Sequence, residues 1–203
     1  DFVPDAKTKF ILTIHDLNFL YEKNTIKANK KLNQLQTKIN KADAIFSISN
    51  FTKSEIEKHL KLKNKTVEVI YNGVESLLNK HSEKPQWLKH DNNFLLAVGN
   101  ITLKKNFHVL LPVMKLLPNH QLIICGNDNS DYANAMKKQI ADEGISNVLM
   151  SGKISEPEKN YLMQHCKAFV FPSLLEGFGL PVIEAMSCGK PVFVSRLTSL
   201  PEI

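Results

Sequence analysis

Residues 168–194, AFVFPSLLEGFGLPVIEAMSCGKPVFV, decide how this chain folds. An apolar run from Ala168 to Pro172 leads into a turn with two glycines. A helix-like stretch from Leu180 to Ser187 follows, and then a second apolar run from Pro191 to Ser195. Short apolar runs that alternate with helical segments are typical of parallel strands covered on both faces. The stretch therefore predicts a strand, a helix and a second parallel strand.

The same alternation precedes this stretch over the second half of the chain. Ser155, Pro157 and Glu158 form a helix start, because serine can cap, proline fits the first turn and glutamate completes a capping box. We expect a Rossmann-like lobe with a parallel sheet. Its predicted strands span 94–98, 121–126, 147–151, 168–172 and 191–195, and its predicted helices span 106–117, 132–143, 155–165 and 180–187.

The beginning of the chain carries a shorter version of this pattern. Ser49 or Asn50 can cap one of its helices, and Asn72-Gly73 is a turn signal. Residues 76–93 are polar and contain Pro85, so we interpret them as a linker between two lobes, 1–75 and 94–203. The first lobe has predicted strands at 10–14, 44–48 and 66–70 and predicted helices at 21–41 and 52–60.

Composition excludes several classes of protein. The 203 residues carry a formal charge of +6, but the lysines are scattered and lack the interleaved aromatic residues of a nucleic-acid-binding surface. No stretch approaches the roughly 18 apolar residues of a membrane-spanning helix. The three cysteines match no zinc pattern, and so sparse a set suits a reducing compartment. The lysine-rich segment 23–41 is interpreted as a solvated helix face, with contact to an anionic membrane as the alternative.

The turn between Pro172 and Leu180 is the strongest candidate site. It lies where a parallel strand ends and a helix begins, which is where ligands of open α/β sheets bind. Gly177 and Gly179 allow close approach of the backbone, and a helix start favours an anion such as a diphosphate. Glu176 and Glu184 can face the same crevice and would accept hydrogen bonds from sugar hydroxyls. Taken alone, the turn could also be an ordinary connection with two solvated glutamates.

The whole string from Pro172 to Val192 resembles the signature of family-4 retaining glycosyltransferases, in which two glutamates are separated by seven residues, as Glu176 and Glu184 are. This resemblance implies a GT-B fold, an α/β fold with two Rossmann-like lobes and parallel sheets. Both lobes look truncated, because the family's first glycine-rich loop and its closing elements are absent. Further stretches resemble the family in the same order, namely 14–17, 47–52, 69–74, 96–99 and 104–106.

The resemblance also implies roles for individual residues. Glu176 matches the contact to the donor sugar, Glu184 matches the residue that holds the ribose hydroxyls, and His15 matches an active-site histidine. Asn100 departs from the family, because many members have an arginine there. The implied catalytic residues are His15, Glu176 and Lys105, and the implied donor-binding residues are Gly99, Lys104, Lys105, Ile154, Glu176, Gly177, Phe178, Gly179, Leu180 and Glu184.

The implied activity is transfer of a hexose with retention of configuration. The donor is a GDP-sugar or a UDP-sugar, with mannose favoured by the stretch from His15 to Leu20. The resemblance implies a front-face displacement without a cofactor or an obligatory metal. The acceptor would be a glycan or a lipid-linked glycan of cell-surface polysaccharide, and the protein would work in the cytoplasm or at the inner face of the membrane.

Two alternatives remain open. The chain could bind a nucleotide sugar without catalysis, or it could be another GT-B enzyme such as a sugar synthase. A redox Rossmann domain does not fit, because no Gly-x-Gly-x-x-Gly follows a predicted strand.

Overall fold

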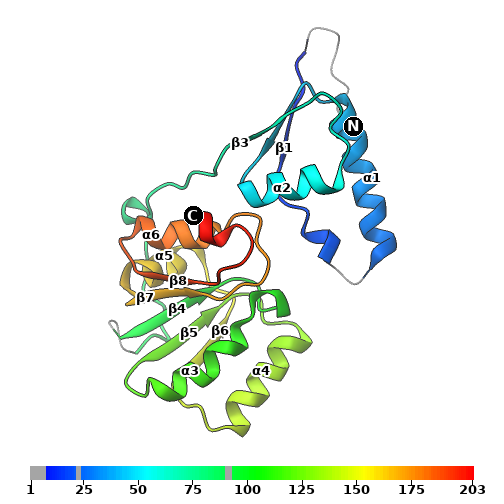
Figure 1. Ribbon diagram of the computed structural model, residues 1–203. Helices are drawn as coiled ribbons and strands as arrows, with labels where there is room; N and C mark the ends of the chain where they lie inside the picture. The colour runs from blue at the N-terminus through cyan, green and yellow to red at the C-terminus, as the bar shows by residue number, and fades with distance from the viewer. Residues whose placement is uncertain (1–7, 22–23, 90–92) are drawn as a thin grey trace. The chain divides into compact units, whose positions relative to one another are not determined.

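The computed structural model describes residues 8–21, 24–89 and 93–203 (Figure 1). The chain divides into two compact units. Unit 1 comprises Asp1–Gly73 together with Glu176–Phe178 and Thr198–Ile203. Unit 2 comprises Val74–Leu175 and Gly179–Leu197. The two short returns to unit 1 were not anticipated from the sequence, which assigned all of 94–203 to one lobe.

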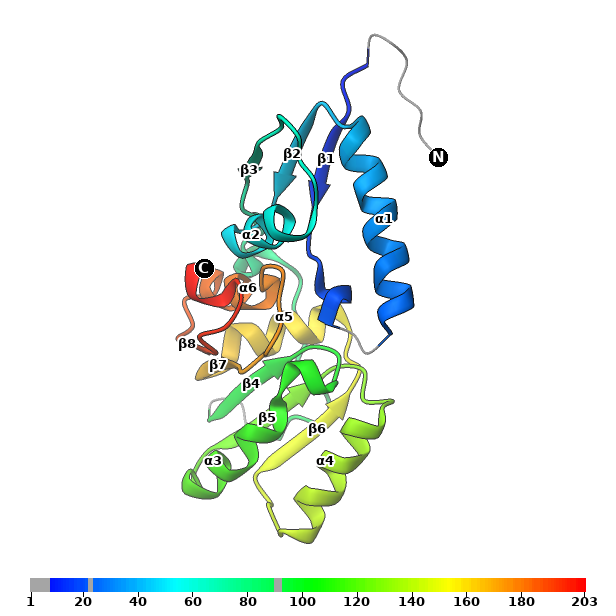
Figure 2. The same ribbon diagram turned by 45° about the vertical axis from the view of Figure 1, so that its right-hand side comes forward.

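Unit 1 is built on a three-stranded parallel sheet in the order β1-β2-β3, formed by Ile11–Ile14, Ala44–Ser47 and Val67–Val69. The long helix α1 (Thr25–Lys41) runs alongside β1, as Figure 2 shows. Its first turn is capped by Asn24, whose side chain accepts a hydrogen bond from the Lys27 amide. Helix α2 (Asn50–His59) is capped by Ser49, one of the two caps that the sequence offered.

The core of unit 1 lies between this sheet and its helices. Ile45 and Ile56 are fully buried, and Ile39 of α1 is 1% exposed. Burying each such side chain favours folding by about 1.5–3 kcal/mol. The apolar positions of β2, α1 and α2 therefore hold the sheet and both helices together.

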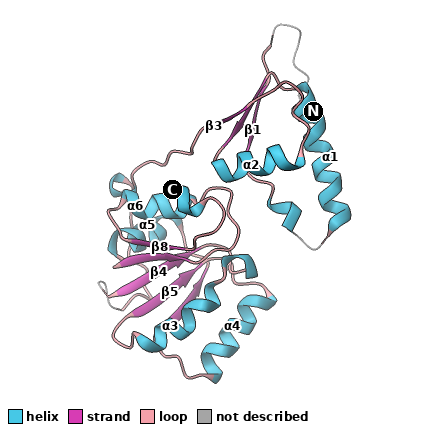
Figure 3. Cartoon of the chain, viewed as in Figure 1, coloured by secondary structure: helices cyan, strands magenta, loops and turns pink. Residues whose placement is uncertain are grey.

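Unit 2 contains a five-stranded parallel sheet in the order β6-β5-β4-β7-β8. Figure 3 shows α3 and α4 on one face of the sheet and α5 and α6 on the other. The strands are β4 (Phe94–Val98), β5 (Gln121–Cys125), β6 (Val148–Gly152), β7 (Ala168–Phe171) and β8 (Val192–Val194). The helices are α3 (Leu110–Leu116), α4 (Asp131–Asp142), α5 (Glu156–His165) and α6 (Leu180–Ser187).

The order of the strands creates a switch point beside β4. The chain passes from β4 to β5 and β6 on one side, and then continues at β7 on the other side of β4. The loops that follow β4 and β7 therefore leave the sheet at neighbouring carboxyl ends and lead to helices on opposite faces, α3 and α6 (Figure 3). This is the position at which open α/β sheets bind ligands.

The predicted strands and helices are present with shifted ends, but one helix differs in kind. The segment 106–117 was expected to be a single helix, yet it begins with 3-10 turns and becomes α-helical only at Leu110. Asn106 adopts a left-handed conformation with φ 59°, which interrupts the path into α3. Asparagine tolerates this conformation better than most residues, so the break is local and specific to this position.

The segment interpreted as a linker is docked on α5. The side chains of Asn160 and Gln164 donate hydrogen bonds to the carbonyls of His81 and Leu77, at 2.9 and 2.7 Å. Leu77 begins a short 3-10 helix, Leu77–Asn79, and is 3% exposed. Within the described ranges, no helix is both long enough and apolar enough to cross a membrane.

Candidate functional site

The loop after β4 brings Gly99 and Lys105 together, two of the residues that the family resemblance implies for donor binding. A β-carbon placed on Gly99 would lie 3.3 Å from Cε and 3.7 Å from Nζ of Lys105, so the lysine side chain passes over the glycine. The loop is packed closely against the end of β5. A β-carbon on Gly126 would lie only 2.0 Å from the carbonyl oxygen of Gly99. Gly126 therefore permits the close approach that shapes this loop.

The ammonium group of Lys105 also lies over an aromatic ring. Its Nζ lies 4.6 Å from the centroid of Phe171, a fully buried residue at the end of β7. Attraction between an ammonium group and an aromatic face is worth about 0.5–2 kcal/mol and restrains the side chain. The positive charge of Lys105 is thus placed at the switch point, between the ends of β4 and β7.

The loops after β4 and β7 are tied to each other by hydrogen bonds. The carbonyl of Lys104 accepts bonds from the Leu174 amide, at 2.7 Å, and from the Ser173 hydroxyl, at 3.1 Å. Lys104 was predicted as a donor-binding residue on account of its charge. The structure shows in addition that its backbone joins the two loops of the switch point.

Helix α6 begins directly after the glycine-containing turn. Its cap is Gly179 with φ 114°, a conformation that side chains rarely adopt, and the Val182 amide donates to the Gly179 carbonyl at 2.8 Å. The positive end of the helix dipole lies at Leu180, which is 44% exposed. This end of α6 can receive an anionic group.

Glu184, one turn into α6, is paired with a residue that sequence reasoning missed. Nζ of Lys159 lies 3.2 Å from Glu184 Oε1 and 2.9 Å from Glu156 Oε2. The side chains of Lys159 and Glu184 are only 16% and 19% exposed. Burial alone would lower the pKa of Lys159, but its bond to Glu156 and the charges of both glutamates raise it above the ordinary value.

A signal for this pair was present in the sequence. Lys159 follows the capping box at Ser155, so it lies about one turn into α5, as Glu184 does in α6. Both helices cover the same face of the sheet, as Figure 1 shows. Two residues at equivalent heights on neighbouring helices can meet, and their opposite charges favour a pair.

Ile154, an implied donor-binding residue, follows β6. Gly152 has φ 72°, and a β-carbon there would lie 3.7 Å from a carboxylate oxygen of Asp128. Asp128 is ion-paired with Lys137 at 2.5 Å, and its hydrogen bond to this lysine lowers the pKa of Asp128. Ile154 is half-exposed and continues the chain beyond this end of the sheet.

In unit 1, Glu176–Phe178 lie against the segment that follows β1. A β-carbon on Gly177 would lie 2.4 Å from the carbonyl oxygen of His15 and 2.8 Å from Cβ of Asp16. The Gly177 carbonyl accepts a hydrogen bond from the buried Ser49 hydroxyl at 2.7 Å. The structure therefore brings His15 together with Gly177, and only a glycine fits at this position.

His15 itself is exposed and lines a cavity of about 310 Å³ in unit 1. Asp16, Lys31 and Lys38 line the same cavity. Lys31 is additionally placed over the ring of Phe19, 5.3 Å from its centroid. A histidine, a carboxylate and two ammonium groups thus share one open depression.

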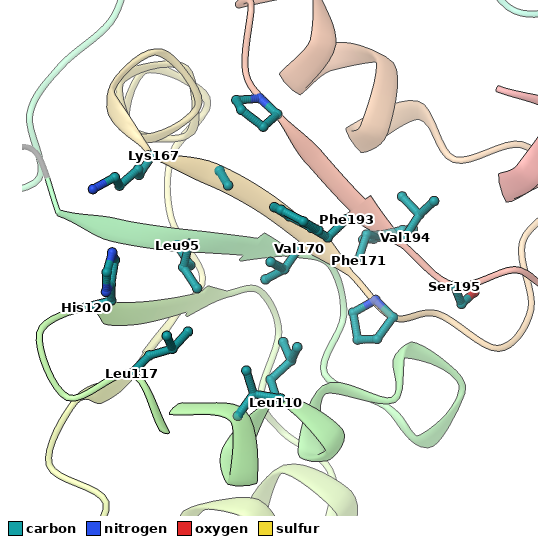
Figure 4. A pocket seen from close by; sticks show the side chains of 14 residues that line it. Leu95, Leu110, Leu117, His120, Lys167, Val170, Phe171, Phe193, Val194 and Ser195 are labelled. Atoms are coloured by element: carbon teal, nitrogen blue, oxygen red, sulfur yellow. The ribbon is translucent and has the colours of Figure 1, made fainter. Parts of the chain in front are cut away.

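A larger apolar cavity of about 610 Å³ lies on the α3 side of the sheet of unit 2 (Figure 4). Leu110 and Leu117 line it from one side, and Val170 and Phe193 line it from the strands. None of the residues predicted to bind the donor lines this cavity. Its apolar walls do not suit a diphosphate, so size alone does not identify the functional site.

Metal ligands show no clustering in the part of the chain that the structure describes. No group of three or more His, Cys, Asp or Glu side chains is arranged there to hold an ion.

Two family profiles match the chain in succession. Residues 4–76 match "Glycosyltransferase Family 4", and residues 79–203 match "Glycosyl transferases group 1". The chain belongs to the group 1 glycosyl transferases. The family predicted from the paired glutamates is thereby confirmed.

Curated relatives include proteins of known and unknown specificity. An uncharacterized glycosyltransferase of Methanocaldococcus jannaschii is 33% identical, covering 95% of this chain and 50% of that protein. The O-antigen chain mannosyltransferase RfbU of Salmonella typhimurium is 29% identical, covering 95% of this chain and 53% of that protein. O-antigen chain mannosyltransferase B of Escherichia coli is 27% identical, covering 100% of this chain and 57% of that protein. The chain thus spans about half the length of these relatives.

Solved structures confirm the GT-B fold of this glycosyl transferase. Anabaena HepE in complex with UDP and glucose superposes with a TM-score of 0.78 at 22% identity, covering 97% of this chain and 55% of that chain. Sucrose-phosphate synthase from Thermosynechococcus elongatus superposes with a TM-score of 0.77 at 23% identity, covering 95% of this chain and 51% of that chain.

Proposed function

We propose that this protein transfers a hexose, mannose in the first place, from a nucleoside diphosphate sugar to a glycan or lipid-linked acceptor. The observation that carries the proposal is the position of Lys105, whose ammonium group is held over Gly99 and Phe171 at the switch point of unit 2. A fixed positive charge there suits a diphosphate. The O-antigen mannosyltransferases among the relatives favour mannose and an acceptor in cell-surface polysaccharide assembly.

The proposed reaction is a displacement on one face of the sugar. The bond between the anomeric carbon and the diphosphate oxygen breaks, and the acceptor oxygen forms its bond on the same face. The acceptor proton passes to the departing diphosphate, and the configuration is retained. The transition state resembles an oxocarbenium ion, so its stabilisation falls mainly on the leaving group.

The residues of this chain would share that task. Lys105 and the N-terminal end of α6 would neutralise the charge that develops on the diphosphate. Glu184 would accept hydrogen bonds from the ribose hydroxyls, and Glu176 from the donor sugar. We propose that these groups replace a metal ion, so that transfer continues when divalent cations are chelated.

The nucleotide base would lie near Ile154, beyond the end of β6. GDP-mannose is the donor that we put first, and a UDP-sugar is the second candidate. The UDP-bound structure of Anabaena HepE, which shares the fold, keeps the second candidate open.

We propose that the acceptor molecule carries negative charge. Lys31, Lys38 and His15 share one cavity in unit 1, which suits the phosphate of a lipid-linked acceptor. Helix α1 contains five lysines and no acidic residue. We propose that α1 meets the anionic inner face of a membrane, where each lysine near the surface contributes about 1 kcal/mol.

Measuring turnover of the nucleotide sugar distinguishes the proposed transferase from two other functions. A binding protein without catalysis would retain the nucleotide sugar unchanged, and a sugar synthase would act on small soluble acceptors. The likeness to sucrose-phosphate synthase makes the second comparison worthwhile, although at 23% identity it shows the fold alone.

The direct test is incubation of the protein with GDP-mannose or UDP-glucose, membrane lipid extract and EDTA. We expect a mannosylated product whose anomeric configuration, read by NMR, matches that of the donor. An inverted product, or transfer that disappears with EDTA and returns with Mg²⁺, would contradict the proposed mechanism. Transfer to simple sugars in preference to the extract would favour the synthase.

A further inference from the structure

The segment after β8 belongs to unit 1 and forms hydrogen bonds with the backbone of Glu176 and Phe178. The Thr198 hydroxyl oxygen accepts a hydrogen bond from the Glu176 amide at 3.2 Å. The single proton of the Ser199 hydroxyl is shared between the Phe178 carbonyl, at 2.9 Å, and the Glu176 carbonyl, at 3.2 Å. Two neighbouring side chains thus hold both the amide and the carbonyl of Glu176.

Burial and backbone conformation both mark this contact as specific. Ser199 is fully buried, so its hydroxyl depends on these carbonyls for its hydrogen bonds. Thr198 has φ 55°, in the left-handed region. This conformation is unusual for a β-branched residue and persists only where the surroundings enforce it. It directs the Thr198 hydroxyl to the Glu176 amide.

Glu202 anchors the other end of the same segment. Its carboxylate accepts hydrogen bonds from the amides of Asn50 and Phe51, at 2.8 and 3.0 Å, and from the Tyr71 hydroxyl at 3.1 Å. The two amides belong to the first turn of α2, where the helix dipole favours a negative charge. Burial would raise the pKa of Glu202, but the bonds from Phe51 and Asn50 lower it.

We propose that Thr198 and Ser199 are positioning residues, which fix the backbone of Glu176 so that its carboxylate meets the donor sugar. Glu202 holds them in place through α2. The proposal rests on the proposed role of Glu176 as the contact to that sugar. It assigns a function to a segment outside the turn that carries the paired glutamates.

This role has a specific signature in binding. The diphosphate and ribose contacts are assigned to Lys105, α6 and Glu184, all in unit 2. Freeing the backbone of Glu176 should therefore weaken the grip on the sugar and spare the grip on the nucleotide. A purely structural role would weaken both equally or lower the melting temperature.

The experiment is calorimetric titration with GDP-mannose and with GDP, and in parallel with UDP-glucose and UDP. The variants are Glu176→Ala, Thr198→Val, Thr198→Ser and Ser199→Ala, and the control is Thr37→Val, which removes a hydroxyl bonded within α1. Thr198→Val and Ser199→Ala should bind the nucleotide sugar about tenfold more weakly, since one hydrogen bond contributes roughly that factor. Affinity for the free diphosphate should stay within about twofold, and Thr198→Ser should bind like the parent.

The outcomes separate this proposal from the one on which it rests. If Glu176→Ala binds nucleotide sugar as the parent does, or if the sugar adds no affinity in the parent, the role of Glu176 fails. If Glu176→Ala loses sugar-dependent affinity while Thr198→Val and Ser199→Ala keep it, the positioning role is refuted. Equal losses for sugar nucleotide and diphosphate would also refute it. Thr198→Val preserves side-chain volume, so it reports on the hydroxyl even if Ser199→Ala fails to fold.

Discussion

Single residues set the shape of the candidate site, and Gly177 is the clearest case. Its neighbours are backbone atoms of His15, which cannot rotate away as a side chain would. The same holds at Gly126, where the backbone of Gly99 is the neighbour. At Gly99 itself the neighbour is the flexible Lys105 side chain, so this position is less restricted sterically.

Gly177→Ala should lower the free energy of unfolding by about 1–3 kcal/mol, because its β-carbon would overlap the His15 carbonyl and force the backbone apart. Urea denaturation would measure the change. Gly73→Ala is the matched control in the same unit, because a β-carbon there meets nothing within 4 Å. Equal stabilities of the two variants would show that the close approach at Gly177 is absent.

The pair of Lys159 and Glu184 gives a second prediction for single residues. Lys159→Met should weaken nucleoside diphosphate binding, because Glu184 would lose the partner that orients its carboxylate. In a Glu184→Gln background, Lys159→Met should weaken nucleoside diphosphate binding less. A coupling free energy of about 0.5–3 kcal/mol is expected for groups in contact. Full additivity of the two changes in binding would rule out the coupling.

Among the elements, the parallel strands were the most predictable from sequence. Runs such as Phe94–Val98 and Ala168–Phe171 are apolar throughout because both faces of the sheet are covered. The break before α3 was not predictable, because apolar periodicity does not reveal that Asn106 is left-handed. Local sequence signals were sufficient to predict a helix or a strand wherever a capping residue or a run of apolar residues determined that element.

The 3-10 helix η1 (Asn18–Tyr21) is joined to α2 by a hydrogen bond with consequences at high pH. The Tyr21 hydroxyl donates to Glu55 at 2.5 Å. This bond, followed by burial and the charge of Glu55, raises the pKa of Tyr21 to about 12. Because the folded-state pKa exceeds the unfolded value of about 10, the bond stabilises the fold below pH 10 and is lost as the pH rises toward 12.

Tyr21→Phe should therefore remove part of the alkaline loss of stability. The difference in unfolding free energy between parent and variant should shrink as the pH is raised from 8 toward 11, measured by urea denaturation at each pH. The comparison isolates Tyr21, since lysines that titrate in this range are common to both proteins. A difference that is constant with pH would contradict the raised pKa.

At the scale of the whole molecule, long-range contacts limited what the sequence could reveal. A parallel sheet could be expected from the alternation of strands and helices, but the order of its strands, and with it the switch point, comes from the structure. The meeting of Thr198 and Ser199 with Glu176 could not, since 22 or 23 residues separate the partners and no local pattern marks them. The height of Lys159 on α5 could be read from its capping box, but its pairing with Glu184 could not be predicted, because the partner lies on a different helix.

The proposed membrane contact is also a property of the whole molecule. Replacing the exposed Lys27, Lys30 and Lys41 by glutamine should reduce binding to vesicles that contain phosphatidylglycerol more than tenfold, at about 1 kcal/mol for each lysine. Sedimentation with the vesicles would measure it. The control replaces the exposed Lys61, Lys89 and Lys138, which lie outside α1. Equal losses of vesicle binding in both variants would show that net charge, and not the position of the lysines on α1, causes the binding.

The switch point of unit 2 is proposed to bind a nucleoside diphosphate through Lys105 and Glu184. Calorimetric titration of the protein with GDP and with UDP, beside Lys105→Ala and Glu184→Ala, tests it most directly. We predict selective binding of one nucleotide, GDP in the first place, that weakens at least tenfold in both variants. Absence of binding by the folded parent, or binding that both variants retain, would contradict the proposed role of Lys105 and Glu184.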